Sequence, residues 1–225
     1  MSLSLECPLV SIVVLSYNSE KYIQETLDSI YCQTYPKIEL VLADDCSCDK
    51  TVDIIKKFIE TSSTRFSAIK LLESPHNAGT SANCNKGEMA CVGDWIKVLA
   101  ADDILLPDCI QKYVTYLIKH PDANFIFSKV EIFGENDDFV DYFDYSFFSK
   151  SRNEQLHQLI FQGNCIPAPS AFFRTEYVRQ LGITNDERVP LIEDLPKWIN
   201  LLNKGTEFSF IDDTLVKYRT GGGYN

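Results

Sequence analysis

The amino-acid sequence predicts an α/β fold with a Rossmann-like, mostly parallel central sheet that is flanked by helices and followed by a smaller region. Short apolar runs without period, at residues 9–16 and 95–101, are typical of parallel strands covered on both faces. Amphipathic stretches separate such runs, as the helices of βαβ units do. The runs at 38–43 and 95–101 are followed by paired acids, and open α/β sheets bind their ligands at the carboxyl ends of strands.

The first half of the chain alternates strands and helices. Residues 9–16 are β-branched and apolar, which predicts a buried strand, and residues 19–33 carry their apolar side chains on one helical stripe. The same patterns predict strands at 38–43, 67–72 and 95–101, and helices at 51–60, 80–91 and 107–120.

The second half is less regular, and the patterns predict strands at 124–133, 171–174, 208–211 and 214–218, and helices at 154–161, 176–181 and 194–204. Residues 134–150 have no periodicity and mix acids with aromatics, so they form either a mobile insertion or a flap that faces the acceptor. We expect one domain over residues 1–225, and the glycine-rich end at 221–225 looks like a chain cut inside a loop.

Composition excludes several functional classes. The formal net charge of -11 repels nucleic-acid backbones, so we expect no nucleic-acid partner. The eight cysteines have no paired CxxC spacing, which favours a reduced cytoplasmic protein over a zinc site or a disulfide framework. No apolar run is long enough to span a bilayer, so any membrane contact is expected to be peripheral.

Two acid pairs are the candidate ligand-binding residues. Asp44 and Asp45 follow one predicted strand, and Asp102 and Asp103 follow another. Neighbouring carboxylates repel each other unless a cation lies between them and a ligand. Oxygen ligands favour Mg²⁺ or Mn²⁺, which usually bind substrate phosphates as well. The alternative from local sequence is that such acids only cap the helices that follow.

Other nucleotide-binding signatures are missing. No GxGxxG or Walker motif occurs in the chain, and no glycine-rich loop with Arg and Lys follows the first strand, as a sugar nucleotidyltransferase would require. Asn77 and Gly79 suit a tight turn that brings backbone close to a ligand, although most such turns are only turns.

The joint order of the motifs resembles glycosyltransferase family 2, the inverting enzymes with the GT-A fold. The resemblance is carried by PLVSIVVLSYNSEKYIQETLDSIYCQTYPKIELVLADDCSCDKT, HNAGTSANCNKGEMACVGDWIKVLAADD, PAPSAFFR, the ED pair and YRTGGG. It implies a nucleotide-sugar-binding half at about residues 7–103 and an acceptor-binding half at about 104–220. It also implies a UDP-type donor, a saccharide or lipid-linked saccharide acceptor, and a Mn²⁺ or Mg²⁺ cofactor.

The resemblance also implies roles for individual residues. Ser16 and Tyr17 would line the nucleoside pocket, and Asp45 would accept a hydrogen bond from the uracil base. Asn77 and Gly79 would belong to the same nucleotide site. In addition, Asp102 would contact the ribose or the metal shell.

The remaining implied roles concern the metal and the chemistry. Asp103 would bind the metal that bridges the diphosphate. Asp194, which follows Glu193 at a helix start, would be the general base, whereas local sequence alone favours a helix cap. The chain has Cys46 where many relatives have glycine. Some relatives have a histidine near the last loop, where this chain has only glycines at residues 221–223. Water could therefore take the place of a third protein ligand of the metal.

The resemblance thus predicts an inverting, metal-dependent glycosyltransferase of cell-surface polysaccharide biosynthesis, acting in the cytoplasm at the inner face of the membrane. The alternative is a domain that binds a nucleotide sugar without turnover, because the chain ends within a glycine-rich loop.

Overall fold

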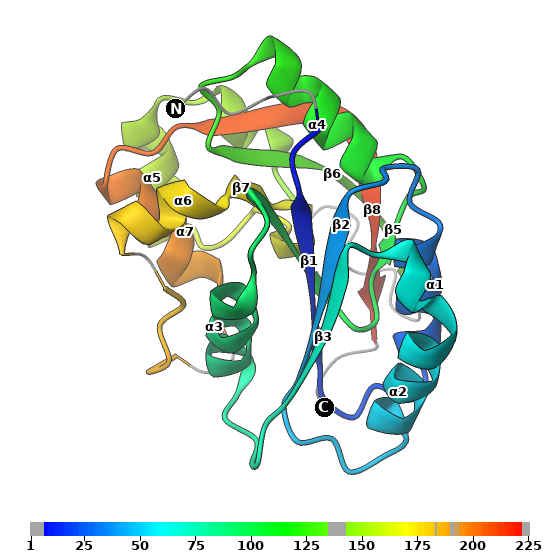
Figure 1. The fold of residues 1–225 in the computed structure, drawn as a ribbon. Helices are drawn as coiled ribbons and strands as arrows, with labels where there is room; N and C mark the ends of the chain where they lie inside the picture. Colours follow the sequence, from blue (N-terminus) through cyan, green and yellow to red (C-terminus); the bar gives the residue numbers. More distant parts are fainter. Residues whose placement is uncertain (1–6, 135–142, 183, 190–191, 193, 222–225) are drawn as a thin grey trace.

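One sheet organises the part of the molecule that is described, with its strands in the order β3-β2-β1-β4-β7-β6-β8-β5 (Figure 1). The computed structural model describes residues 7–134, 143–182, 184–189, 192 and 194–221. The strands are β1 (Val10–Ser16), β2 (Ile38–Asp44), β3 (Ala68–Glu73), β4 (Trp95–Ala100), β5 (Ile104–Leu105), β6 (Phe125–Gly134), β7 (Phe172–Arg174) and β8 (Phe208–Thr220).

Helices lie on both faces of this sheet. They are α1 (Ile23–Tyr31), α2 (Thr51–Ser62), α3 (Thr80–Ala90), α4 (Cys109–Lys119), α5 (Arg152–Phe161), α6 (Thr175–Leu181) and α7 (Asp194–Asn203). Short 3₁₀ turns are η1 (Ser63–Arg65), η3 (Tyr145–Ser149) and η4 (Ala168–Ser170). The predicted α/β class is therefore confirmed.

The parallel half forms as the apolar runs predict. β1 pairs in parallel with β2 and β4, and β2 pairs in parallel with β3. Ile12 and Val14 pack on one face of β1, whereas Val13 packs on the other. Helices α1, α2 and α4 cover the first face, and α3, α5, α6 and α7 cover the second (Figure 1). Burial on both faces explains why these strands are largely apolar in sequence.

The register of the parallel strands brings the candidate site residues to one edge. Ser16 is paired with Asp44, and Leu15 with Ala100. Asp45 directly follows β2, and Asp102 and Asp103 follow β4 after one residue. The carboxyl ends of β1, β2 and β4 thus place both acid pairs on the same side of the sheet.

The second half differs from the prediction in its strands. Residues 208–220 form one strand, β8, and the gap predicted at residues 212–213 is a bulge where the pairing with β6 shifts register. The acids in that gap suggested a turn, but a bulge absorbs extra residues without ending a strand. Only two residues long, β5 was not predicted; it pairs antiparallel with β8.

Some helices also begin at residues other than those predicted. Helix α1 begins at Ile23 rather than at residue 19, and α4 begins at Cys109, so Pro107 lies before the helix instead of in its first turn. The stretch that lacked periodicity contains η3, whereas residues 135–142 lie outside the described residues. Of residues 190–193, only Ile192 is described.

Candidate active site

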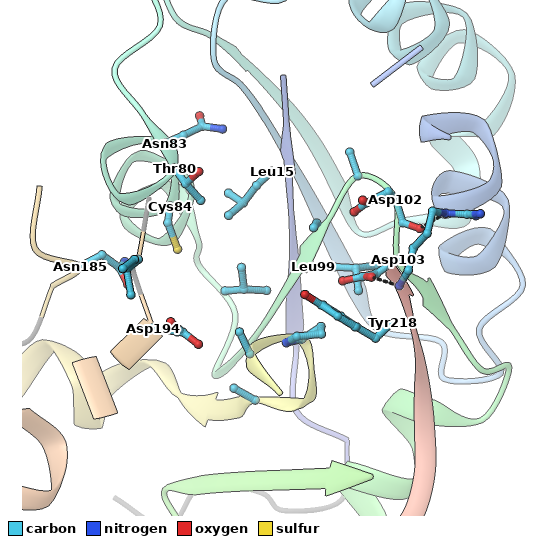
Figure 2. A pocket seen from close by; sticks show the side chains of 18 of the residues that line it. Leu15, Thr80, Asn83, Cys84, Leu99, Asp102, Asp103, Asn185, Asp194 and Tyr218 are labelled. Atoms are coloured by element: carbon cyan, nitrogen blue, oxygen red, sulfur yellow. Dashed lines mark hydrogen bonds between the residues drawn. The ribbon is translucent and has the colours of Figure 1, made fainter. Parts of the chain in front are cut away.

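A cavity of about 1000 Å³ opens at the carboxyl ends of β1 and β4. Figure 2 shows Asp102 and Asp103 on one side of it, and Asp194 and Asn185 on another. Thr80, Asn83 and Cys84 of α3 form a further wall, on the same side of the view as Asn185. The cavity therefore contacts both acids that the sequence analysis assigned to the metal and to the base.

Asp102 and Asp103, called the acid turn below, are fixed by the last strand. The carboxylate oxygen Asp103 Oδ1 accepts a hydrogen bond from the backbone N–H of Arg219 at 2.9 Å. The side chain of Arg219 donates from Nε to the carbonyl of Asp102 at 2.9 Å and from Nη2 to Glu25. Its guanidinium also lies over the rings of Tyr22 and Phe133, so β8 holds the turn through both backbone and side chain.

The surroundings of the acid turn disfavour two negative charges in the absence of a ligand. Burial, followed by the neighbouring Asp102, raises the pKa of Asp103 well above its usual range. Burial also raises the pKa of Asp102, and the Arg219 charge opposes that rise. Each carboxylate would keep its charge more easily beside a cation.

The donor set fits Mg²⁺ or Mn²⁺. Asp103 Oδ2 is buried and has no hydrogen-bond partner among the described residues, which leaves one acceptor open for a cation. No group of three or more His, Cys, Asp or Glu side chains gathers anywhere in the described ranges. The protein would supply one or two carboxylates, and diphosphate oxygens and water would complete the shell, as is usual for Mg²⁺.

The nucleoside end of the cavity lies at β1 and β2. Ser16, Tyr17 and Asp45 line the cavity, as the sequence analysis expected of a nucleotide pocket. The hydroxyl of Ser16 donates to Asp44 Oδ1 at 2.9 Å, so the first acid of this pair is engaged within the protein. Ser47 also donates to Asp44 from its backbone and its hydroxyl, which leaves Asp45 as the acid that faces the cavity.

Asn77 and Gly79 are not among the described residues that line the cavity. They are connected to it through Asp45, whose carboxylate accepts the backbone N–H groups of Ala78 at 3.0 Å and Gly79 at 2.8 Å. Asn77 Oδ1 accepts from the same Gly79 N–H at 3.0 Å, and Gly79 has φ of 89°, which a side chain would disfavour. Their direct role in nucleotide binding stays a prediction.

Asp194 begins α7 and faces the cavity from the opposite side. Its Oδ1 accepts from the backbone N–H of Leu195 at 2.7 Å, and its Oδ2 accepts from Asn164 Nδ2 at 2.5 Å. Burial raises the pKa of Asp194, while these two hydrogen bonds oppose the rise. The carboxylate is thus oriented by its neighbours and still borders the cavity, as a general base must. Glu193 lies outside the described residues.

A polar wall that the sequence analysis missed lies on α3. Asn83, Glu88 and the α7 residue Lys197 are nearly buried, and all three line the cavity. Glu88 and Lys197 form an ion pair at 2.5 Å. The available signal was the polar composition of residues 80–91, because a helix that packs on a sheet usually presents an apolar stripe.

A buried lysine in β4 was also missed. Lys97 is fully buried, and its Nζ donates to the carbonyls of Pro169 and Ala171. Burial lowers the pKa of Lys97 to about 8. Because Pro169 and Ala171 line the cavity, this lysine helps to position the wall opposite α3.

The comparisons with known proteins agree on one family. A model of the family described as glycosyl transferase family 2 matches residues 11–182. An uncharacterized glycosyltransferase of Haemophilus influenzae is 30% identical over 220 residues, covering 96% of this chain and 67% of that protein. The putative teichuronic acid biosynthesis glycosyltransferase TuaG of Bacillus subtilis is 27% identical over 212 residues, covering 94% of this chain and 79% of that protein.

Solved structures share the fold. S. aureus TarS 1–349 in complex with UDP-GlcNAc superposes with a TM-score of 0.78 at 22% identity, covering 96% of this chain. The mannosyltransferase PcManGT of Pyrobaculum calidifontis, in complex with GDP-Man and Mn²⁺, gives 0.70 at 21% identity and covers 94%. The chain spans 60% of that TarS chain and 57% of PcManGT. No helix within the described ranges is long and apolar enough to cross a membrane.

Proposed function

The chain belongs to glycosyl transferase family 2, and from this premise we propose that it transfers a sugar from a UDP-linked donor to an acceptor hydroxyl with inversion. Its fold is the GT-A fold. TuaG is named for teichuronic acid biosynthesis, and this similarity supports a role in polysaccharide assembly. The proposal includes a saccharide or lipid-linked saccharide acceptor and a location at the cytoplasmic face of the membrane. The proposal places the donor-binding half at about residues 7–103 and the acceptor-binding half at about residues 104–220.

One observation carries the proposal. The acid turn presents a buried carboxylate oxygen, Asp103 Oδ2, that has no partner among the described residues, and the same cavity is bordered by Asp194 on another side. A site for a cation with diphosphate and a site for a base therefore face a single space. When bound, the cation would offset the negative charge that develops on the departing diphosphate.

Residues of the chain itself would bind the nucleoside and accept the proton. Ser16, Tyr17 and Asp45 would hold the nucleoside, and Asp45 would keep Gly79 in place at the same time. Asp194 would accept the proton of the acceptor hydroxyl. The acceptor oxygen then forms its bond to the anomeric carbon from the face opposite the diphosphate, while the bond to the diphosphate oxygen breaks and its electron pair leaves with UDP. Inversion follows from that single displacement.

Donor binding and slow hydrolysis test the proposal without an identified acceptor. The protein is titrated with UDP, UDP-glucose and UDP-N-acetylglucosamine in the presence and absence of Mn²⁺, and unfolding temperature is recorded, since a ligand that binds only the folded state raises it. Release of UDP is then followed over hours. Stabilisation with Mn²⁺ and slow UDP release are expected. Binding without any release would favour a non-catalytic nucleotide-sugar-binding domain, and no stabilisation by any of the ligands would overturn the donor site.

A further inference from the structure

The cavity wall on α3 follows the path that a donor would take. Thr80, Cys84 and Glu88 line the cavity at intervals of four residues, so they share one face of the helix. Helix α3 begins beside Gly79, which is bonded to Asp45 at the nucleoside end. From Thr80 to Glu88 the helix rises by about 12 Å. The wall therefore runs from the nucleoside end towards the residues around Asp194.

The end of this wall holds a buried ion pair. Glu88 Oε1 accepts from Lys197 Nζ at 2.5 Å, and the amide of Asn185 donates to the same oxygen at 3.4 Å. The side chains of Glu88 and Lys197 are only 10% and 4% exposed. Buried pairs of this kind contribute little net stability, because the loss of hydration offsets their attraction. Stability alone does not account for placing one at the edge of the cavity.

The pair retains free hydrogen-bonding capacity. Every hydrogen bond that Glu88 accepts from the described residues goes to Oε1, including one from Cys84 Sγ at 3.3 Å, which leaves Oε2 as an acceptor. Among the same residues, Lys197 Nζ has one hydrogen-bond acceptor for its three N–H groups, and it also lies over the Phe173 ring. Asn83, four positions after Gly79, adds a buried side-chain oxygen with no partner in the same ranges. A ligand at this wall would thus meet an acceptor and a donor side by side, which is how protein sites bind a sugar hydroxyl.

The position of the pair identifies which sugar would contact it. Lys197 follows Asp194 by three residues on α7, so the two side chains lie one turn apart on neighbouring positions of the helix surface. In an in-line displacement the anomeric carbon lies between the base and the diphosphate site. The ring of the transferred sugar must therefore lie between Asp194 and the acid turn, beside the α3 wall (Figure 2).

The charge of the cavity restricts the sugar further. Carboxylates outnumber cationic side chains around it, and Lys197 and Arg219 are the cations in the described part of its lining. Lys197 is neutralised by Glu88, and Arg219 is engaged with Asp102 and Glu25. A carboxylate on the sugar would face Glu88 without a free cation beside it.

On these grounds, and resting on the proposed function, we propose that Glu88 and Lys197 are specificity-determining residues that bind ring hydroxyls of the transferred sugar and select an uncharged sugar over a uronic acid. Glu88 accepts a hydrogen bond from a hydroxyl, and Lys197 donates one to a neighbouring oxygen.

The test separates sugar binding from nucleotide binding. Dissociation constants are measured with Mn²⁺ for UDP, UDP-glucose, UDP-galactose, UDP-N-acetylglucosamine and UDP-glucuronic acid. The wild-type protein is expected to bind its best neutral donor at least about tenfold more tightly than UDP-glucuronic acid. In the double variant Glu88→Met/Lys197→Met, affinity for UDP should stay within about twofold, whereas affinity for that neutral donor should fall about tenfold.

Two further variants serve as controls. Lys56→Met/Glu73→Met makes the same change in an exposed pair at 3.1 Å outside the cavity, and it should alter neither affinity. Glu88→Gln keeps the side-chain shape, so it covers the case in which the double variant fails to fold. This variant should also lower the affinity for the neutral donor and leave the affinity for UDP unchanged.

Failure of the inference is distinguishable from failure of the proposed function. If the wild-type protein binds no UDP, the donor site itself is wrong. Suppose instead that the wild-type protein binds UDP, but the cavity variants leave the dissociation constants of the UDP-sugars unchanged or weaken the binding of UDP equally. Only the sugar-recognition role is then overturned. The same holds if UDP-glucuronic acid binds as tightly as the neutral donors, or if only the KM of an acceptor changes.

Discussion

Asp103 and Asp194 border one cavity, but their neighbours differ in kind. Asp103 lies beside a second acid, and one of its oxygens has no partner among the described residues. Asp194 lies beside Asn164 and the backbone of Leu195, which donate hydrogen bonds to both of its oxygens. The first arrangement suits a bound cation, whereas the second would suit a carboxylate that accepts a proton in the proposed role of Asp194.

Asp103→Asn should abolish the metal dependence of UDP binding. The substitution removes a charge but keeps the shape, and the side-chain oxygen can still accept from the Arg219 N–H. Ligand-free protein should melt at an unchanged or higher temperature at neutral pH, because a buried carboxylate with a raised pKa has been removed. Titration calorimetry with UDP and Mn²⁺ measures the first effect and thermal melting the second. A melting temperature that drops without any change in UDP binding would show a purely structural role.

Asp194→Asn should act on transfer and not on donor binding. A general base commonly contributes about 10²–10⁴ in rate, so UDP release in the presence of an acceptor should fall by that factor while UDP affinity stays near wild type. Steady-state kinetics and calorimetry on the same preparation decide the matter. Equal weakening of UDP binding by this variant and by Asp103→Asn would contradict the separate roles.

Cys46→Gly should stabilise the protein. Cys46 has φ of 68°, a left-handed conformation that costs a residue with a side chain roughly 1–2 kcal/mol. Glycine removes that cost but loses more backbone freedom on folding, so the net gain in free energy of unfolding is expected to be about 0.5–1 kcal/mol. Urea unfolding measures it, with Cys46→Ala as the control that keeps the left-handed strain. A glycine variant no more stable than the alanine variant would refute the explanation.

At the scale of elements, α3 owes its place to a glycine. A Cβ built on Gly87 would lie 2.5 Å from Val13 Cγ1, so the helix approaches β1 more closely than any larger residue permits. On the same helix, Asn83 and Glu88 are nearly buried and line the cavity, and Asn83 Nδ2 donates to the carbonyl of Ala43 in β2 at 2.8 Å. The helix therefore serves the site through its distance from the sheet as much as through its side chains.

Gly87→Ala should destabilise the protein by about 1–3 kcal/mol, because overpacking at a rigid β-branched neighbour displaces the helix. Denaturant unfolding gives the value. The double variant Val13→Ala/Gly87→Ala makes room for the added methyl, so its loss should be smaller than the sum of the single losses. Additive losses would show that the two residues do not contact as described.

At the scale of the whole molecule, the two proposed halves are joined within one sheet. Lys97 contributes to that junction, because it lies on β4 and donates to the carbonyls of Pro169 and Ala171 around η4. The ammonium group of Lys97 is buried away from water, and the nearby Asp103 is among the groups that favour its charged form. A lysine that is partly neutral near neutral pH thus links the strand before the acid turn to the opposite wall of the cavity.

Lys97 should make stability depend on pH. The pKa of Lys97 is about 8 in the folded protein and returns to 10.5 on unfolding, so the unfolded state binds more protons between these values. Its contribution to the free energy of unfolding is therefore present above 10.5 and is lost as pH falls through about 8. Between about pH 7 and about pH 9.5 the change is on the order of 1–2 kcal/mol. Urea unfolding of wild type and Lys97→Met at both pH values measures it. Parallel profiles would contradict the prediction.

The sequence was sufficient for the parallel half of the fold and for four of the acids around the cavity, Asp45, Asp102, Asp103 and Asp194. Runs such as 38–43 are easy to recognise because burial on both faces leaves few polar positions, and Glu39 is the one charged residue in that run. The pairing of β5 with β8 and the bulge at residues 212–213 depend on partners far along the chain, which local patterns do not contain. For the same reason, the Glu88–Lys197 pair could not be read from sequence, since its members are 109 residues apart.

The contacts between β8 and the acid turn affect when the site can form during translation. Asp103 and Arg219 are separated by 116 residues, and chains leave the ribosome from the N-terminus onward. A growing chain that already contains β1 to β4 has both acids but lacks the backbone N–H that orients one and the guanidinium that secures the other. The acid turn is therefore completed late in translation. A donor nucleotide would then meet a finished cavity only after most of the fold protecting it exists.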